Sequence, residues 1–236
     1  MRVALRVAYK GTDFFGSQIQ KETPHTVFGT MQRVFLQLGI QSKIVASGRT
    51  DKGVHASGQV CHVDLPSHWS DTQKLKTVAN RMLPQSIHIK AIYRVPKEFH
   101  ARYGAKKRLY RYFIKTGESN PFEADFITFV KECNFEQLQE NITIFQGEHD
   151  FKNFIKTGSD EKSTTRVIYK SFAYRYNGMI VLYFEANGFL RTQIRLMVGA
   201  LLELKSSEIK ECLYLQKKYK IKPAPPNGLY LAKIKY

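Results

Sequence analysis

The sequence predicts an α+β protein with largely antiparallel sheets. Segments with the two-residue alternation of half-buried strands are mixed along the chain with segments whose apolar residues recur at helical spacing. An Asn-Gly pair at 177–178 separates two β-rich segments, and such a pair is the strongest short-range signal of a β-hairpin. This mixture, with at least one hairpin, favours α+β over a doubly wound parallel sheet.

The first half of the chain opens with a predicted strand at 2–9, where apolar residues alternate with basic and small ones. A helix is predicted from Val27 to Leu38, with Thr26 as a candidate N-cap and Gly39 placed to end it. Further along, the patterns predict short strands at 43–46 and 59–63, a helix between Ser70 and Pro84, and a strand at 87–95.

The second half contains a candidate strand at 106–114, in which Tyr110 and Tyr112 share one face. A helix is predicted between Phe135 and Phe145, followed by the hairpin strands at 165–176 and 179–186. Apolar residues at helical spacing from Leu190 to Leu202 predict another helix, and a further one is expected at 207–217. The last segment is interpreted as a proline-containing loop and a final strand.

A chain of 236 residues has room for one large domain or two small ones. The change between the two groups of strands predicts an N-terminal domain at 1–103 and a C-terminal domain at 104–236. The first contains the polar glycine-flanked loop at 48–56, and the second contains the strand at 106–114 and the helix at 190–202.

The composition is strongly basic. Lys and Arg total 37 against 20 Asp and Glu, so the formal charge is +17. This excess indicates a polyanionic partner, with nucleic acid before an anionic membrane, although a basic surface without a partner is the ordinary alternative. The charge is uneven, because the segment 118–150 holds eight acids and one base. A phosphate backbone is expected to avoid that segment.

Three well-separated cysteines make a disulfide framework or a thiolate zinc site improbable and suit a reducing compartment. The N-terminus alternates and lacks the apolar run of a signal peptide, and no stretch approaches the ~20 apolar residues that span a bilayer. We therefore expect a cytoplasmic protein without a membrane partner.

The segment GRTDKGVHA, at 48–56, concentrates polar side chains between glycines, which allow the backbone to turn tightly near a ligand. Taken alone, an Asp in such a loop is more often a turn or capping residue. The longer segment GRTDKGVHASGQVCHVD resembles the signature of the tRNA pseudouridine synthase A family, in which the Asp of this motif, here Asp51, is catalytic.

Other segments resemble motifs of the same family, in the same order, over nearly the whole chain. They are YKGT to GSQ at 9–18, TVFG at 26–29, FHAR at 99–102, RLYRY at 108–112, GEHDF at 147–151, TRVI at 165–168, ANGFL at 186–190, RLMVG at 195–199 and APPNGLYL at 224–231. Any one short motif is weak, whereas their order along the chain is specific. Three positions depart from the family pattern, with Lys10 in place of Asp, Ser17 in place of Trp, and Gly188 where a residue with a side chain is common.

The resemblance implies two RRM-like (ferredoxin-like) halves joined around a central cleft, a homodimer, and uridines 38, 39 and 40 of the tRNA anticodon stem-loop as substrates. It implies that Arg195 is the basic partner of Asp51, that Tyr110 contacts the base, and that Leu229 forms an apolar wall. Arg49 is a second guanidinium close to Asp51 in sequence. From the residues alone, a flank position that lets Arg195 reach a cleft is as well supported as an exposed helix residue or a phosphate contact, and core packing is the favoured explanation for Tyr110 and Leu229.

Pseudouridylation breaks the N1–C1′ bond, turns the base and joins C1′ to C5, and it requires neither metal nor nucleotide. The sequence accordingly contains no P-loop, no H-E-x-x-H and no complete dinucleotide fingerprint. An ionised Asp51 can attack C1′ or C6, or deprotonate the sugar to give a glycal, and the sequence does not choose among these routes. His55 and His62 lack a further ligand at metal spacing and are interpreted as structural or RNA-facing.

Two alternatives remain at this point. One is a non-catalytic RNA-binding protein on the same scaffold, and the other is an RNA nuclease or phosphotransferase.

Overall fold

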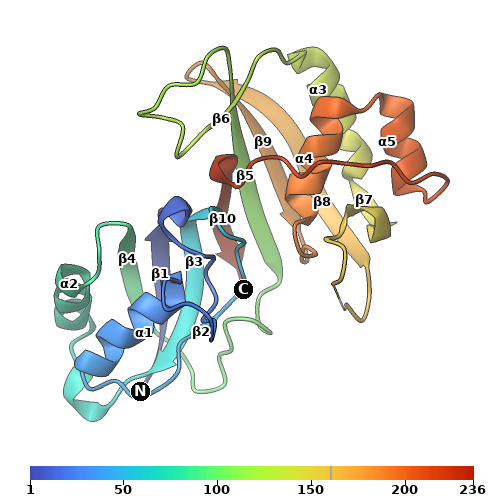
Figure 1. The fold of residues 1–236 in the computed structure, drawn as a ribbon. Coiled ribbons are helices and arrows are strands. Elements are labelled where there is room, and N and C mark those ends of the chain that lie inside the picture. Colours follow the sequence, from blue (N-terminus) through green and yellow to red (C-terminus); the bar gives the residue numbers. More distant parts are fainter. Residues whose placement is uncertain (160) are drawn as a thin grey trace. The chain divides into compact units, whose positions relative to one another are not determined.

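The structure is a computed structural model that describes residues 1–159 and 161–236. The chain forms two compact units (Figure 1). The first unit is Met1–Lys106 together with Tyr230–Tyr236, and the second unit is Lys107–Leu229. The expected boundary between residues 103 and 104 lies close to this division. Residues 230–236, expected in the C-terminal domain, group with the first unit.

The first unit contains a sheet built around β1 (Arg2–Tyr9), which pairs antiparallel with β3 (His55–Asp64) and β4 (Ile87–Arg94). The short β2 (Val45–Ala46) pairs antiparallel with β3, and β10 (Leu229–Lys235) joins β3 in parallel through Tyr230 and Leu231. The strand order β4-β1-β3-β2, with a helix after β1 and after β3, is the β-α-β-β-α-β arrangement of a ferredoxin-like fold.

One face of this sheet is covered by α1 (Val27–Gln37), and α2 (Thr72–Met82) packs beside α1 and β4. Successive side chains of β1 point to opposite faces of the sheet. Val3, Leu5 and Val7 are completely buried on the face that the helices cover, whereas Arg6 is exposed on the other face. The N-cap prediction for α1 is confirmed, since the Thr26 side chain accepts a hydrogen bond from the Gly29 N–H. For α2 the structure places the cap one residue after Ser70, at Asp71, whose carboxylate accepts from two N–H groups of the first turn.

The second unit contains a sheet in the order β5-β9-β8-β7, all of whose neighbours pair antiparallel. These strands are β5 (Lys107–Thr116), β9 (Met179–Ala186), β8 (Thr165–Tyr176) and β7 (Gly147–Asp150), and β6 (Thr128–Val130) adds to β5 in parallel. The predicted hairpin is confirmed between β8 and β9, where Asn177 and Gly178 both have positive φ, as a type I′ turn requires.

Three helices complete the second unit: α3 (Phe135–Asn141), α4 (Gln193–Glu203) and α5 (Ser206–Leu213). Short 3-10 turns occur at Gly11–Asp13, Ser67–Trp69, Ile142–Phe145, Lys152–Phe154 and Pro226–Gly228. The core of the second unit is rich in aromatic side chains, and those with almost no exposure are Tyr112, Phe145, Phe151, Phe154 and Phe184. The α+β class with mainly antiparallel strands is therefore confirmed in both units.

Within the two described ranges, we find no helix that combines the length and apolar character needed to cross a bilayer.

Candidate active site

The loop that carries Asp51 connects β2 to β3 in the first unit. The Val54 N–H donates to the Asp51 carbonyl at 3.1 Å, and Gly53 follows with a φ of +81°, so the chain turns sharply just after the carboxylate. Asp51 is half-buried and the neighbouring Arg49 is exposed. This loop therefore presents a carboxylate on a tight turn, with a guanidinium two residues before it.

Thr50, immediately before Asp51, is held on three sides. Its N–H donates to the Ser17 hydroxyl at 2.8 Å, and its carbonyl accepts from the Ser17 N–H at 3.1 Å. Its own hydroxyl shares a hydrogen bond of 2.8 Å with the Tyr9 hydroxyl at the end of β1. Because Thr50 and Ser17 are buried, these bonds are shielded from water, and they fix the backbone that precedes Asp51.

The position of Ser17 gives a structural reason for its departure from the family pattern. The side chain is completely buried and its small hydroxyl fits directly against the Thr50 backbone. Lys10, the second departure, forms an ion pair with Asp13 at 3.2 Å on the surface of the same region. At Gly188, the third, a Cβ would make an ordinary contact of 3.6 Å with the Arg166 side chain, so no contact among the described residues requires glycine there.

Gln59 on β3 supports the start of the same loop. Its amide donates to the Gly48 carbonyl at 3.0 Å, and its side-chain oxygen accepts from the Ser47 hydroxyl at 2.6 Å. Burial raises the pKa of Tyr9 to about 12, so this hydroxyl keeps its proton and remains able to bond with Thr50. Sequence reasoning missed Tyr9, Ser17, Thr50 and Gln59 as loop supports, although Thr50 adjoins the catalytic candidate.

The two histidines near the loop have structural positions. His55 is buried, its Nδ1 accepts from the Gly11 N–H at 3.0 Å, and its ring stacks on Tyr230 with centroids 4.6 Å apart. Gly11 must be glycine, because a Cβ there would lie 2.0 Å from the Val54 carbonyl oxygen. His62 accepts from the Ala101 N–H at 3.1 Å. Among the residues that the structure describes, no cluster of His, Cys, Asp and Glu is suited to hold a metal ion.

Tyr110, in the second unit, lies on β5 and is only 8% exposed. Its ring meets Phe189 edge-to-face, with centroids 5.3 Å apart. Tyr112, two residues along the same strand, is completely buried, and its hydroxyl bonds to the Thr128 hydroxyl at 2.7 Å and donates to the Pro225 carbonyl at 2.8 Å. Burial raises the pKa of Tyr112 well above its usual value, so it acts as a donor.

Arg195 is half-buried on α4, and its Nε donates to the Ala224 carbonyl at 2.7 Å. The Ala224 N–H in turn donates to the Arg195 carbonyl at 2.8 Å, so segment 224–225 is held by Arg195 on one side and by Tyr112 on the other. The helix expected from Leu190 begins later than predicted, at Gln193, so Leu190 and Arg191 precede α4.

Leu229 is 5% exposed and opens β10. The preceding turn at Pro226–Gly228 packs against β5, where the Gly228 backbone lies beside Tyr112. In the second unit, Tyr110 lies on β5, Arg195 bonds to segment 224–225, and Leu229 directly follows the turn at 226–228 that packs against β5. Asp51 and Arg49 belong to the first unit.

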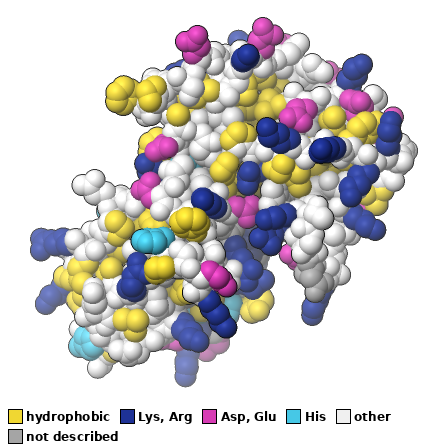
Figure 2. All heavy atoms as spheres, viewed as in Figure 1, with side chains coloured by type: hydrophobic (Ala, Val, Ile, Leu, Met, Phe, Trp, Pro, Cys, Tyr) yellow, Lys and Arg dark blue, Asp and Glu magenta, His cyan; other side chains and the backbone are white. Residues whose placement is uncertain are grey.

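Basic side chains lie over both units on the face drawn in Figure 2, with acidic side chains among them. Next to the catalytic candidate, the Lys52 ammonium lies 4.1 Å from the ring centre of Phe15, which is half-exposed. A carboxylate on a fixed turn, with exposed cations and an aromatic ring beside it, is suited to act on a polyanionic substrate.

The chain was compared with known proteins. A family model described as tRNA pseudouridine synthase matches residues 6–104 and 142–236. A tRNA pseudouridine synthase A from Wolinella succinogenes is 40% identical over 233 residues, covering 97% of this chain and 92% of the relative. Proteins of the same name from Campylobacter jejuni and Helicobacter hepaticus are 37% and 36% identical, covering at least 97% of both chains in each pair.

Among solved structures, a crystal structure of a Cbf5-Nop10-Gar1 complex matches with a TM-score of 0.39 and 11% identity, over 85% of this chain and 45% of that one. This likeness is too weak to add to the sequence comparisons. The family model covers most of the chain, and the relatives match it from end to end. The chain therefore belongs to the tRNA pseudouridine synthase family, a family of isomerases.

Proposed function

We propose that this enzyme converts uridine to pseudouridine at positions 38, 39 and 40 of the tRNA anticodon stem-loop, with Asp51 as its catalytic carboxylate. The observation that carries the proposal is the fixed geometry of the Asp51 turn, where Thr50 is held by Ser17 and Tyr9. A carboxylate must be held in place to react with one atom of a bound sugar or base, since small displacements cost large factors in rate.

In this proposal Asp51 reacts in its ionised form, by attack on C1′ or C6 or by deprotonation of the sugar. Nearby guanidinium groups favour the ionised form, and Arg49 and Arg195 are the candidates for that role. No cofactor or metal is required, because the reaction is redox-neutral and moves one bond within a single nucleotide.

The remaining site residues are proposed to bind the detached base. Tyr110 offers a ring for stacking and a hydroxyl for proton transfer at C5. Leu229 offers an apolar wall. A uridine within a stem must leave its stack to reach a carboxylate, at a cost of a few kcal/mol, and phosphate contacts from basic residues offset that cost.

We also propose a homodimer acting in the cytoplasm. The homodimer is what the resemblance to the family implies, and the three free cysteines suit a reducing compartment.

The test uses tRNA labelled with tritium at C5 of uridine, because isomerisation releases that tritium and simple binding does not. We expect release by the wild-type enzyme and none by Asp51→Asn, which keeps the shape of the side chain but loses its charge. Affinity for tRNA should change less than about threefold, since phosphates are neutralised by cations and a carboxylate does not contribute to that term.

Mapping the modified positions by sequencing then tests uridines 38, 39 and 40 separately from the chemistry. Tritium release by Asp51→Asn would remove Asp51 from the mechanism. Binding without release by the wild type would favour a non-catalytic RNA-binding protein, and chain scission would favour a nuclease.

A further inference from the structure

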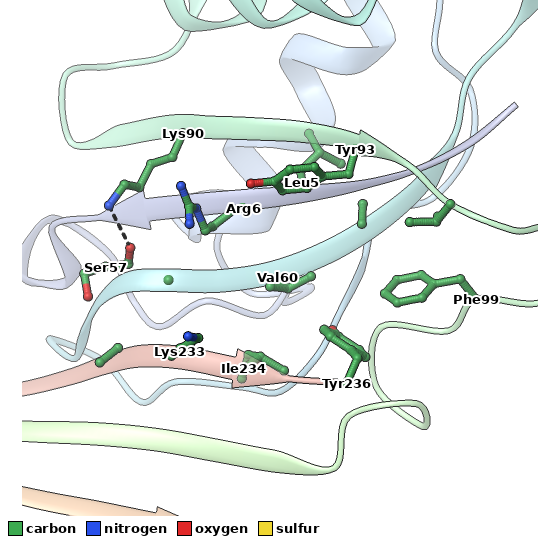
Figure 3. A pocket seen from close by; sticks show the side chains of 14 residues that line it. Leu5, Arg6, Ser57, Val60, Lys90, Tyr93, Phe99, Lys233, Ile234 and Tyr236 are labelled. Atoms are coloured by element: carbon green, nitrogen blue, oxygen red, sulfur yellow. Dashed lines mark hydrogen bonds between the residues drawn. The ribbon is translucent and has the colours of Figure 1, made fainter.

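A groove of about 500 Å³ lies on the uncovered face of the first unit's sheet (Figure 3). It crosses β4, β1, β3 and β10, and every residue that lines it belongs to the first unit. The register places Arg6 beside Val60 and Ala4 beside Tyr93, so these side chains share one face of the sheet. The opposite face is the one that α1 covers, and α1 passes behind the strands in Figure 3. We call this feature the sheet groove.

Small residues form the floor of the sheet groove and large ones form its rim. Ala4, Gly58 and Ala232 leave the floor low between neighbouring strands. Gly58 is required there, because a Cβ would lie 2.2 Å from the Ala232 carbonyl oxygen and would push β10 away from β3. The hollow is therefore built into the strand packing, and no rearrangement is needed to open it.

The rim carries three cations and no anion. Arg6, Lys90 and Lys233 are all exposed, and none of the 14 lining residues is Asp or Glu. Lys90 reaches across the sheet to the Ser57 carbonyl at 3.3 Å. Three like charges around one hollow repel one another, and an anionic occupant relieves that repulsion.

Aromatic rings lie at the end of the sheet groove opposite Lys90 and Ser57. Tyr93 is 52% exposed, and Phe99 and Tyr236 pack together with ring centres 4.8 Å apart. The Tyr236 hydroxyl donates to the Ala101 carbonyl at 2.8 Å, which fixes its ring at the rim. Exposed rings beside cations on an open sheet provide stacking surfaces and phosphate contacts together.

We propose that the sheet groove binds a single-stranded segment of RNA, with one base stacked at Tyr93 and the backbone phosphates held by Arg6, Lys90 and Lys233. A second copy of this chain is a poorer occupant, because it would bring the same three cations against a groove whose lining contains no acid, and Asp64, the acid farther along this face, is paired with Arg2. None of the lining residues comes from the loop at 47–54, so this surface is separate from the Asp51 turn. The proposal does not depend on which uridines the enzyme modifies.

The test measures binding of a fluorescein-labelled oligouridine of ten nucleotides by fluorescence anisotropy. The double variant Arg6→Glu, Lys233→Glu should weaken binding at least about tenfold, since it removes two phosphate contacts and adds two repulsions. The control variant Lys74→Glu, Arg81→Glu makes the same charge change at exposed positions on α2 and should change binding less than about twofold.

A second pair of variants tests stacking. Tyr93→Ala should weaken binding at least about fivefold, while Tyr93→Phe, which keeps the ring, should bind nearly as the wild type does. A duplex of the same length should bind the two Tyr93 variants and the wild type nearly equally, because its bases are already stacked.

Equal losses in the two charge-reversal variants would overturn the proposal, since general charge would then explain them. Unchanged RNA binding would also overturn it, and so would a groove variant that only shifts the protein from dimer to monomer in sedimentation. Because the decamer is bound and not modified, these outcomes are independent of tritium release from tRNA.

Discussion

Thr50 holds the backbone immediately before Asp51 through its hydrogen bonds to Ser17 and Tyr9. The hydroxyl bond to Tyr9 is buried, so removing it leaves the Tyr9 hydroxyl with fewer partners and frees one side of the turn. We expect Thr50→Val, which keeps the shape of the side chain, to lower kcat about tenfold or more and to leave KM for tRNA within about threefold. Thr50→Ser keeps the hydroxyl and should retain most activity. Equal rates for the two variants in tritium release would rule out this positioning role.

His62 predicts a pH dependence of stability. Burial, with Arg2 and His100 as further causes, lowers the pKa of His62 below its ordinary value of 6.5. The unfolded chain therefore takes up a proton at this residue more readily than the folded chain does. The contribution of His62 to stability is complete above pH 6.5 and is lost as the pH falls through the unfolded and then the folded pKa.

We expect the free energy of unfolding, measured with urea, to decrease from pH 7.5 to pH 5.5. His62→Gln should show a shallower decrease than the wild type, whereas His88→Gln, at an exposed position on β4, should parallel the wild type. Parallel curves for all three proteins would show that His62 does not carry the effect.

At the scale of elements, the position of segment 224–225 is fixed by hydrogen bonds from both β5, through Tyr112, and α4, through Arg195. Tyr112→Phe removes a buried hydrogen bond to Thr128 and a partly buried one to Pro225, and should reduce the free energy of unfolding by about 1–3 kcal/mol. Because the same segment accepts the Arg195 bond, kcat should also decrease several-fold. Tyr103→Phe, at a ring that is 79% exposed, is the control and should alter neither quantity. An unchanged urea midpoint for Tyr112→Phe would contradict this reasoning.

Elements whose signal is local could be predicted from the sequence. Thr26 and Gly39 bound α1 because capping and a positive φ depend on adjacent residues. The Asn177-Gly178 turn is local in the same way. The helix expected at 207–217 ends earlier, at Leu213, and β6 and β7 were missed. A strand of three or four residues is too short for its alternation to be recognised in the sequence. β6 and β7 form strands because they pair with β5 and β8, and this pairing is visible only in the fold.

The site residues themselves stay predictions, and the contacts around them could be predicted only in part. The resemblance proposes Asp51, whereas two of the side chains that hold its turn, Tyr9 and Ser17, lie far from it in the sequence. No periodicity brings Tyr9 and Gln59 to that loop. The sheet groove was equally hidden, since its floor depends on small residues from separate strands that become neighbours only when the sheet forms.

At the scale of the whole molecule, charge is divided unequally between the units. The first unit carries 18 Lys and Arg and 6 Asp and Glu, whereas the acidic segment 118–150 lies entirely in the second. We expect tRNA affinity to decrease at least about 100-fold between 50 and 200 mM salt, as for about four neutralised phosphates. Filter binding at several salt concentrations gives the slope of log affinity against log salt concentration, and this slope measures the number of neutralised phosphates.

The acidic segment supplies the control. Glu132→Gln, Glu140→Gln neutralises two exposed acids there and should leave both the affinity and the salt slope nearly unchanged. A flat salt response of the wild type would contradict the assignment of phosphate binding to the basic surface.

The return of β10 to the first unit has a consequence for biosynthesis. Residues 230–236 leave the ribosome only after all of the second unit has been made, yet they pair with β3 and place Tyr230 against His55. Until then β3 keeps part of one edge without its partner, and such an edge invites association with other nascent chains. The sheet of the first unit is therefore completed only after the second unit has been translated.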